Sequence, residues 1–176
     1  MSDKNTLSLL GVVLLIIGLI NVPGTAWAQV DWTTVGSAGT VDEADSQRVA
    51  FDLGTATLRP GAVGTLNLRY NVVAVDGLFR ADGAELGVRF RDNGAAAQVI
   101  VRLKRYNLET GALTTLLTLN SNAFPAQNGF QLRTAVDCSL RFNFFDFAYF
   151  MDVELTKDTA AGTPALAIIQ LASVRC

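Results

Sequence analysis

The strongest constraint on the fold is a two-residue alternation of apolar and polar side chains that recurs along the chain after residue 29. In the run GTLNLRYNVVAV the apolar residues are Leu66, Leu68, Tyr70 and Val72, and the polar residues between them are Asn67, Arg69 and Asn71. Successive side chains of a β-strand point to opposite faces, so this period indicates strands with one buried face. No run after residue 29 keeps the 3.6-residue period of an amphipathic helix. An all-β fold is therefore predicted.

Turn-forming residues separate the alternating runs. They include Asp76-Gly77, Asn93-Gly94 and the stretch NLETGA at 107–112. Short runs between such turns predict about nine or ten antiparallel strands, among them GFQLRTAV, CSLRFNF, AYFMDVELT and ALAIIQLASV. This number favours an antiparallel β-sandwich with jelly-roll-like connections. An immunoglobulin arrangement fits less well, because Trp32, the only tryptophan after residue 28, lies far before Cys138.

The first 28 residues have the features of a signal peptide. A polar start precedes the uncharged stretch 7–20, and Pro23 and an Ala-x-Ala site follow it. The stretch is shorter than the roughly 20 residues that span a bilayer. We therefore expect cleavage after Ala28, a single β-sandwich domain at 29–176, and a secreted or periplasmic location without stable membrane insertion. A retained membrane anchor is the alternative.

The net charge and the cysteine content of the chain restrict its expected binding partners and its cellular compartment. The net charge of −2 gives no indication of nucleic-acid binding. The two cysteines, Cys138 and Cys176, predict one disulfide in an exported protein, although free thiols or an intermolecular bridge are alternatives. Closing a loop of about 39 residues contributes about 4 kcal/mol in the chain-entropy model.

The run CSLRFNFFDFAYF at 138–150 contains six of the fifteen aromatic residues of the chain. Alternation across two predicted strands, CSLRFNF and AYFMDVELT, assigns Phe142, Phe144 and Tyr149 to the core. Three further aromatic residues break the pattern and are candidates for ligand contact: Phe145, Phe147 and Phe150. The alternative is that these three rings cover a sheet end or pack under a loop.

A basic group is predicted on the hairpin at 84–106. If its register is regular, one sheet face carries Arg89, Arg91, Arg102 and Lys104, with Arg69 nearby. Such a patch could bind carboxylates or sulfates of an anionic polysaccharide, because arginine pairs with oxyanions through two hydrogen bonds. An ordinary solvated strand face is the alternative.

An acidic loop provides a candidate calcium site. Asp42, Glu43 and Asp45 lie close together in the stretch VDEAD, and Ca²⁺ prefers oxygen ligands. The spacing is not that of an EF-hand, and a solvated acidic loop is the alternative. No other cofactor is expected.

Catalysis is disfavoured by the absence of histidine, the commonest general base. The best acid–base pair is Asp152 and Glu154, whose positions on one strand face are about 7 Å apart, within the range of inverting glycosidases. A secreted non-catalytic module that binds a glycan or another surface ligand is the leading hypothesis. A structural subunit of an extracellular fibre or surface layer is the alternative, and a glycoside hydrolase is a distant third.

The two leading hypotheses differ in the N-terminal segment, residues 29–45. In a fibre subunit this segment would add a strand to a neighbouring molecule and so mediate self-association. In a binding module, Trp32 would dock in its own sandwich. We expect docking in the same chain.

Overall fold

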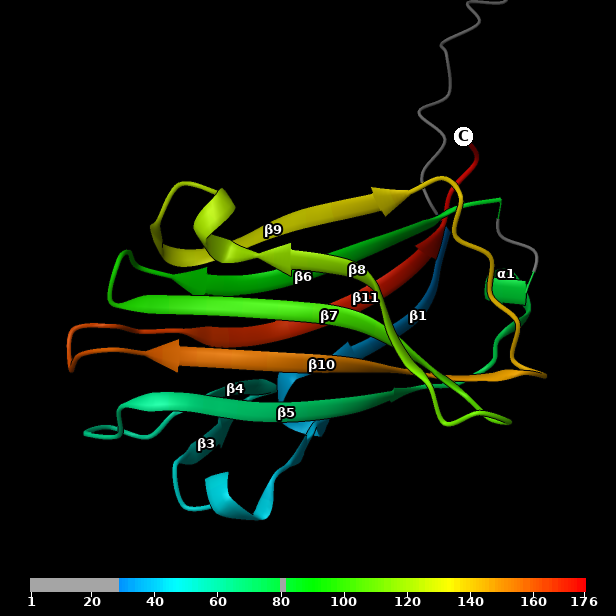
Figure 1. Cartoon of the computed structure of the whole chain (residues 1–176). Coiled ribbons are helices and arrows are strands. Elements are labelled where there is room, and N and C mark those ends of the chain that lie inside the picture. The colour runs from blue at the N-terminus through cyan, green and yellow to red at the C-terminus, as the bar shows by residue number, and fades with distance from the viewer. Residues whose placement is uncertain (1–28, 80–81) are drawn as a thin grey trace, which may run out of the picture.

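The computed structural model describes residues 29–79 and 82–176, which form two antiparallel sheets packed face to face (Figure 1). The strands are β1 (Gln29–Val35), β2 (Thr40–Val41), β3 (Val49–Asp52), β4 (Thr55–Leu58), β5 (Gly64–Val72), β6 (Ala84–Asp92), β7 (Ala97–Asn107), β8 (Leu113–Asn120), β9 (Gln127–Asp137), β10 (Phe147–Lys157) and β11 (Ala165–Ser173). The helical turns of this part of the chain are η1 (Gly36–Ala38), η2 (Glu43–Asp45), α1 (Asp76–Phe79) and η3 (Ser121–Ala123).

One sheet has five strands in the order β2-β5-β10-β7-β8, and the other has six, with β3-β4-β11-β6-β9 in a row and β1 paired to β11. The chain changes sheet at most connections, as from β4 to β5, from β5 to β6 and from β10 to β11, which gives a jelly-roll-like sandwich. The predicted all-β antiparallel sandwich is therefore confirmed, with eleven strands rather than nine or ten.

The alternation in the sequence decides which side chains enter the core. In β5, Leu66 and Leu68 have no exposed surface. Arg69, which follows Leu68 and points to the other face of the strand, is exposed. The same holds in β6, where Val88 and Phe90 are fully buried on either side of the exposed Arg89. Buried apolar side chains from both sheets form one hydrophobic core.

The N-terminal strand docks in its own chain, as expected. β1 pairs antiparallel with β11, and Trp32 is 8% exposed within the hydrophobic core. Within the described residues, no helix has the length and apolar character to cross a membrane. The expected signal peptide, residues 1–28, lies outside the described residues.

The expected strand CSLRFNF is wrong, because residues 138–146 form a loop between β9 and β10. The backbone N–H groups of Phe145 and Asp146 donate to the side-chain oxygen of Asn143. This oxygen takes the place of the backbone acceptor that a neighbouring strand would supply. The core assignment nevertheless holds for Phe142 and Tyr149, which are 6% and 3% exposed.

Aromatic rings of this loop close one end of the core. The rings of Phe142 and Phe144 are stacked with centroids 5.8 Å apart, and Tyr149 lies 5.0 and 4.8 Å from them. The Tyr149 hydroxyl accepts a hydrogen bond of 2.9 Å from the backbone of Asn143. Most of the aromatic run therefore stabilises the fold.

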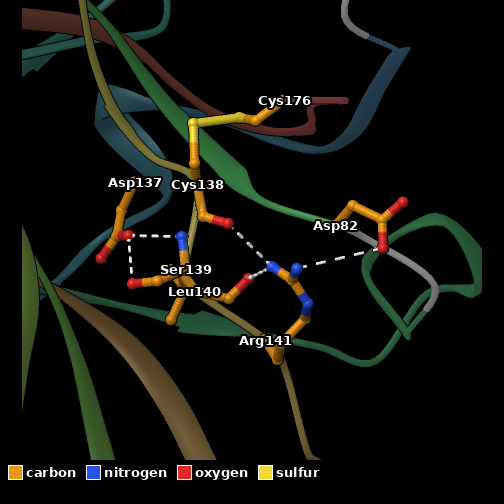
Figure 2. Close-up of a disulfide and its surroundings, with 7 residues drawn as sticks. All are labelled: Asp82, Asp137, Cys138, Ser139, Leu140, Arg141 and Cys176. Carbon is orange, nitrogen blue, oxygen red and sulfur yellow. Dashed lines mark hydrogen bonds and ion pairs between the residues drawn. A yellow bond between two sulfur atoms is a disulfide. The ribbon is translucent and has the colours of Figure 1, made fainter.

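The predicted disulfide is confirmed. Cys138 and Cys176 are bridged, with their Cα atoms 5.7 Å apart (Figure 2). Cys138 begins the loop after β9, so the bridge fastens the segment after β11 to this loop. Arg141 donates to the backbone oxygens of Cys138 and Leu140, which holds the turn beside the disulfide (Figure 2).

Candidate ligand-binding face

The outer face of the five-stranded sheet carries most of the polar side chains that the sequence singles out. The register places Asp152 of β10 between Arg69 of β5 and Arg102 of β7. The next row places Phe150 between Asn71 and Lys104. All of these positions alternate with the buried row of their strand, so the side chains stand on one surface.

Ion pairs cross this surface between neighbouring strands. The Lys104 ammonium lies 2.5 Å from Asp152, and the Arg102 guanidinium lies 2.6 Å from Glu154. Arg69 pairs with Asp42 at 3.1 Å. Each of these cations therefore has an anionic partner.

Arg102 is the most firmly held of these cations. Its hydrogen bond to Glu154 is the main cause that raises the pKa of Arg102, and the charges of Glu154 and Asp152 act in the same direction, whereas burial lowers it. The guanidinium stays charged and fixes the orientation of both carboxylates.

A hollow of about 710 Å³ lies over this surface, which we call the sheet groove. Its lining residues are Asp42, Asn67, Arg69, Asn71, Lys104, Tyr106, Leu113, Ala148, Tyr149, Phe150, Asp152 and Glu154. One end is apolar, because Tyr106 pairs with Ala148 and with Leu113 across the sheet. The other end is polar and contains the amides and the ion pairs.

The groove combines two kinds of contact. Tyr106 is 44% exposed and Phe150 is half-buried, so both offer ring surface to a ligand. The side chains of Asn67 and Asn71 supply both donors and acceptors. Apolar surface with a few convergent polar groups is the usual composition of a small-molecule site.

Tyr106 is not among the predicted ligand-binding residues, although the sequence contains the indication. In the run QVIVRLKRY, Tyr106 has the same parity as Arg102 and Lys104, so a regular strand places all three on one face. The groove itself depends on the sheet order β2-β5-β10-β7, which the local pattern does not reveal.

The predicted basic patch is wrong. Asn93-Gly94 connects β6 of the six-stranded sheet to β7 of the five-stranded sheet, so Arg89 and Arg91 lie on the opposite side of the sandwich from Arg102 and Lys104. The four cations do not meet, and the two on the five-stranded sheet, Arg102 and Lys104, are paired with carboxylates. Arg69 does join Arg102 and Lys104, as expected.

The acidic loop does not form the expected calcium site. Asp42 pairs with Arg69, whereas Asp45 turns inward and is only 3% exposed. Glu43 remains exposed. In residues 29–79 and 82–176, no cluster of three acidic, histidine or cysteine side chains is arranged to hold a metal ion. The carboxylates are separated because arginine and asparagine side chains bind two of them.

Asp45 instead fastens the loop to β5. Its carboxylate accepts hydrogen bonds from the backbone and side-chain nitrogens of Asn67, at 2.8 and 3.1 Å, and pairs with Arg48. Burial alone would raise the pKa of Asp45, but these hydrogen bonds and the charge of Arg48 outweigh it and lower the pKa below its usual value.

The three candidate aromatic residues fall in different places. Phe150 lies in the sheet groove. Phe147 begins β10 and packs against the core, with the Arg105 guanidinium 4.6 Å from its ring centroid. Phe145 is 85% exposed in the β9–β10 loop and lines, with Phe147, a second hollow of about 510 Å³ beside the β7–β8 loop.

The candidate catalytic pair does stand on one face, but its surroundings differ from those of a glycosidase acid. Asp152 and Glu154 each face a lysine or arginine at hydrogen-bond distance. A general acid needs surroundings that favour its neutral form. The geometry therefore suits structural ion pairs on the floor of the groove.

Comparison with known proteins shows similarity of fold. No protein-family model matches the chain, and no curated protein matches its sequence. The CBM22-1 and GH10 modules of Clostridium thermocellum endo-1,4-β-D-xylanase 10B, complexed with xylohexaose, match with a TM-score of 0.50 and 8% identity over 83% of this chain and 28% of that chain.

Two further structures match over nearly their whole length. The carbohydrate-binding module CBM6cm-2 from Cellvibrio mixtus lichenase 5A, in complex with cellotriose, has a TM-score of 0.44 and 13% identity over 83% of this chain and 99% of that chain. The apo form of BiXyn10A CBM1 has a TM-score of 0.47 and 10% identity over 82% and 99%. At such identities the similarity concerns the β-sandwich fold alone.

Proposed function

We propose that the chain is a non-catalytic binding module that holds a polysaccharide in the sheet groove. The observation that carries this proposal is the exposed ring of Tyr106 beside Phe150, at one end of a groove whose other end is lined by amides and paired charges. A pyranose ring has an apolar C–H face and a rim of hydroxyl groups. Both of these meet a matching surface in the groove.

Each part of the groove has a role in this proposal. Tyr106 and Phe150 pack against the C–H face of a sugar and contribute by burying apolar surface. Asn67 and Asn71 exchange hydrogen bonds with hydroxyl groups. The ion pairs hold lysine, arginine and carboxylate groups in fixed positions, so that their remaining donors and acceptors are oriented before the ligand arrives.

A secreted or periplasmic location is part of the proposal. The Cys138–Cys176 disulfide supports it, because such bridges persist in oxidising compartments. A polysaccharide ligand is also accessible there. The fibre-subunit alternative has less support, since β1 already pairs with β11 of the same chain and is not available to a neighbour.

Titration calorimetry with xylohexaose and cellotriose, extended to a panel of neutral and acidic polysaccharides, tests the function. We expect binding to at least one glycan, weakened at least tenfold, or about 1.4 kcal/mol, by Tyr106→Ala. Phe51→Ala is the matched control, because this aromatic side chain is also 44% exposed and lies on β3 of the other sheet. Absence of binding to the whole panel, or equal loss in both variants, would count against the proposal.

A further inference from the structure

The outer face of the six-stranded sheet differs in character from the sheet groove. Strands β1, β11, β6 and β9 lie side by side there, and their outward side chains form three rows. The first row is Val35, Ile168, Arg89 and Leu132, the middle row is Thr33, Gln170, Gly87 and Thr134, and the third row is Glu85 and Val136 beside the buried Ala172. We call this surface the six-stranded face.

Apolar side chains remain exposed on this face. Leu132 is 49% exposed, Val136 is 51% exposed, and Val35 is 45% exposed. They flank the middle row on both sides, Leu132 and Val35 in one outer row and Val136 in the other. This pattern leaves apolar surface in water on both sides of a polar row.

The two charged side chains of these rows, Glu85 and Arg89, have no ion-pair partner in the part of the chain that the structure describes. Neither Glu85 nor Arg89 forms an ion pair or a side-chain hydrogen bond with any residue in the described ranges 29–79 and 82–176. On the outer face of the five-stranded sheet, by contrast, Arg69, Arg102 and Lys104 are all paired. The two faces of the sandwich therefore differ in charge pairing.

The arrangement of these residues is self-complementary. Glu85 and Arg89 stand two positions on either side of Gly87, on the same strand and the same face. A two-fold axis can run between two such faces, parallel to the middle row and across the strands. Rotation about it brings Glu85 of one copy opposite Arg89 of a second copy, and Arg89 of the first copy opposite Glu85 of the second. The same rotation brings Leu132 opposite Val136 of the second copy.

The middle row is polar and lies on the axis. Gly87 has no side chain, and the side chain of Gln170 occupies the space beside it, 2.6 Å from where a Cβ at Gly87 would stand. The amide of Gln170 and the hydroxyls of Thr33 and Thr134 therefore face their own copies across the axis. Two sheets that pack face to face keep their strands roughly aligned, as this axis requires.

We propose that the six-stranded face binds the same face of a second copy of this chain, in a two-fold symmetric dimer with reciprocal Glu85–Arg89 ion pairs. The dimer goes beyond the proposed glycan binding and does not depend on it. Four strands about 4.8 Å apart offer only several hundred Å² per partner, below the roughly 800 Å² of a standard stable interface. Association is therefore weak and depends on protein concentration.

Charge reversal tests the contact through sedimentation velocity over a concentration series. Glu85→Arg and Arg89→Glu each place like charges opposite one another, so we expect each to raise the dimer dissociation constant at least tenfold. An equimolar mixture of the two variants restores opposite charges across the interface, and so does the double variant E85R/R89E. We expect both to associate like the unmodified chain, and increasing salt to weaken association.

Two controls keep the result interpretable. Thermal unfolding verifies that each variant is folded, and Leu132→Asp disrupts the apolar contact without altering either member of the ion pair. An unmodified chain that remains monomeric at the highest concentration would overturn the proposal and leave the face to a different partner. Single variants that associate normally, or a mixture of folded variants that stays monomeric, would overturn it as well.

Discussion

Asp45 shows how one residue in an acidic loop can act as an anchor. Its carboxylate is buried and holds the loop against β5 through Asn67 and Arg48. The run VDEAD contains no indication of which acid turns inward, because Asn67, which donates two hydrogen bonds to Asp45, lies on strand β5. The calcium prediction failed for this reason.

Replacing Asp45 by Asn should lower the free energy of unfolding by about 2 kcal/mol at neutral pH, because charge-assisted hydrogen bonds are lost. The pKa of Asp45 is lowered in the folded state, so its stabilising contribution is present above the usual aspartate pKa of 3.8 and is lost as the pH falls through the folded value. The difference between Asp45→Asn and the unmodified chain should therefore shrink at about pH 3. Urea unfolding at both pH values measures this, and a difference that does not change with pH would contradict it.

At the scale of strands and loops, the sequence predicts which face of a strand is buried better than it predicts which strands lie next to each other. The alternation in β5 and β6 assigns buried and exposed rows correctly, because burial on a strand follows a local period. The prediction that Asn93-Gly94 turns the chain within one sheet is wrong, because a turn motif does not specify whether the next strand stays in the same sheet or crosses to the other. The sheet groove could therefore be predicted only in part.

The aromatic loop illustrates a second limit. Phe142 and Tyr149 are buried as the alternation predicts, although residues 138–146 form no strand. A loop whose rings fill the end of the core produces the same apolar period as a strand. Side-chain hydrogen bonds, here from Asn143, decide between the two.

The disulfide at the start of this loop should contribute measurably to stability. Cys138→Ser or Cys176→Ser should each lower the free energy of unfolding by about 2–4 kcal/mol, because the bridge closes a long loop in the unfolded chain. Guanidinium unfolding of the variants measures the change, and reduction of the unmodified protein serves as the control. A variant as stable as the oxidised protein would show that the bridge contributes little.

At the scale of the whole molecule, export can be tested directly. We predict that the secreted protein begins at Gln29, because the Ala-x-Ala site precedes it. Mass spectrometry of the intact secreted protein measures the N-terminus, which can carry a pyroglutamate. An intact Met1, or a start well inside the stretch VDWTTV at 30–35, would contradict the prediction.

The position of β11 in the six-stranded sheet affects how the chain can be made. β11 pairs with β6 on one edge and with β1 and β4 on the other, yet it is synthesised after every other described strand. A hydrogen bond from Thr33 to Ile169, for example, joins residues 136 positions apart. The ribosome must therefore release nearly the whole described chain before this sheet can close. A chain that stays open for so long exposes unpaired strand edges, and such edges favour aggregation until the last strand pairs.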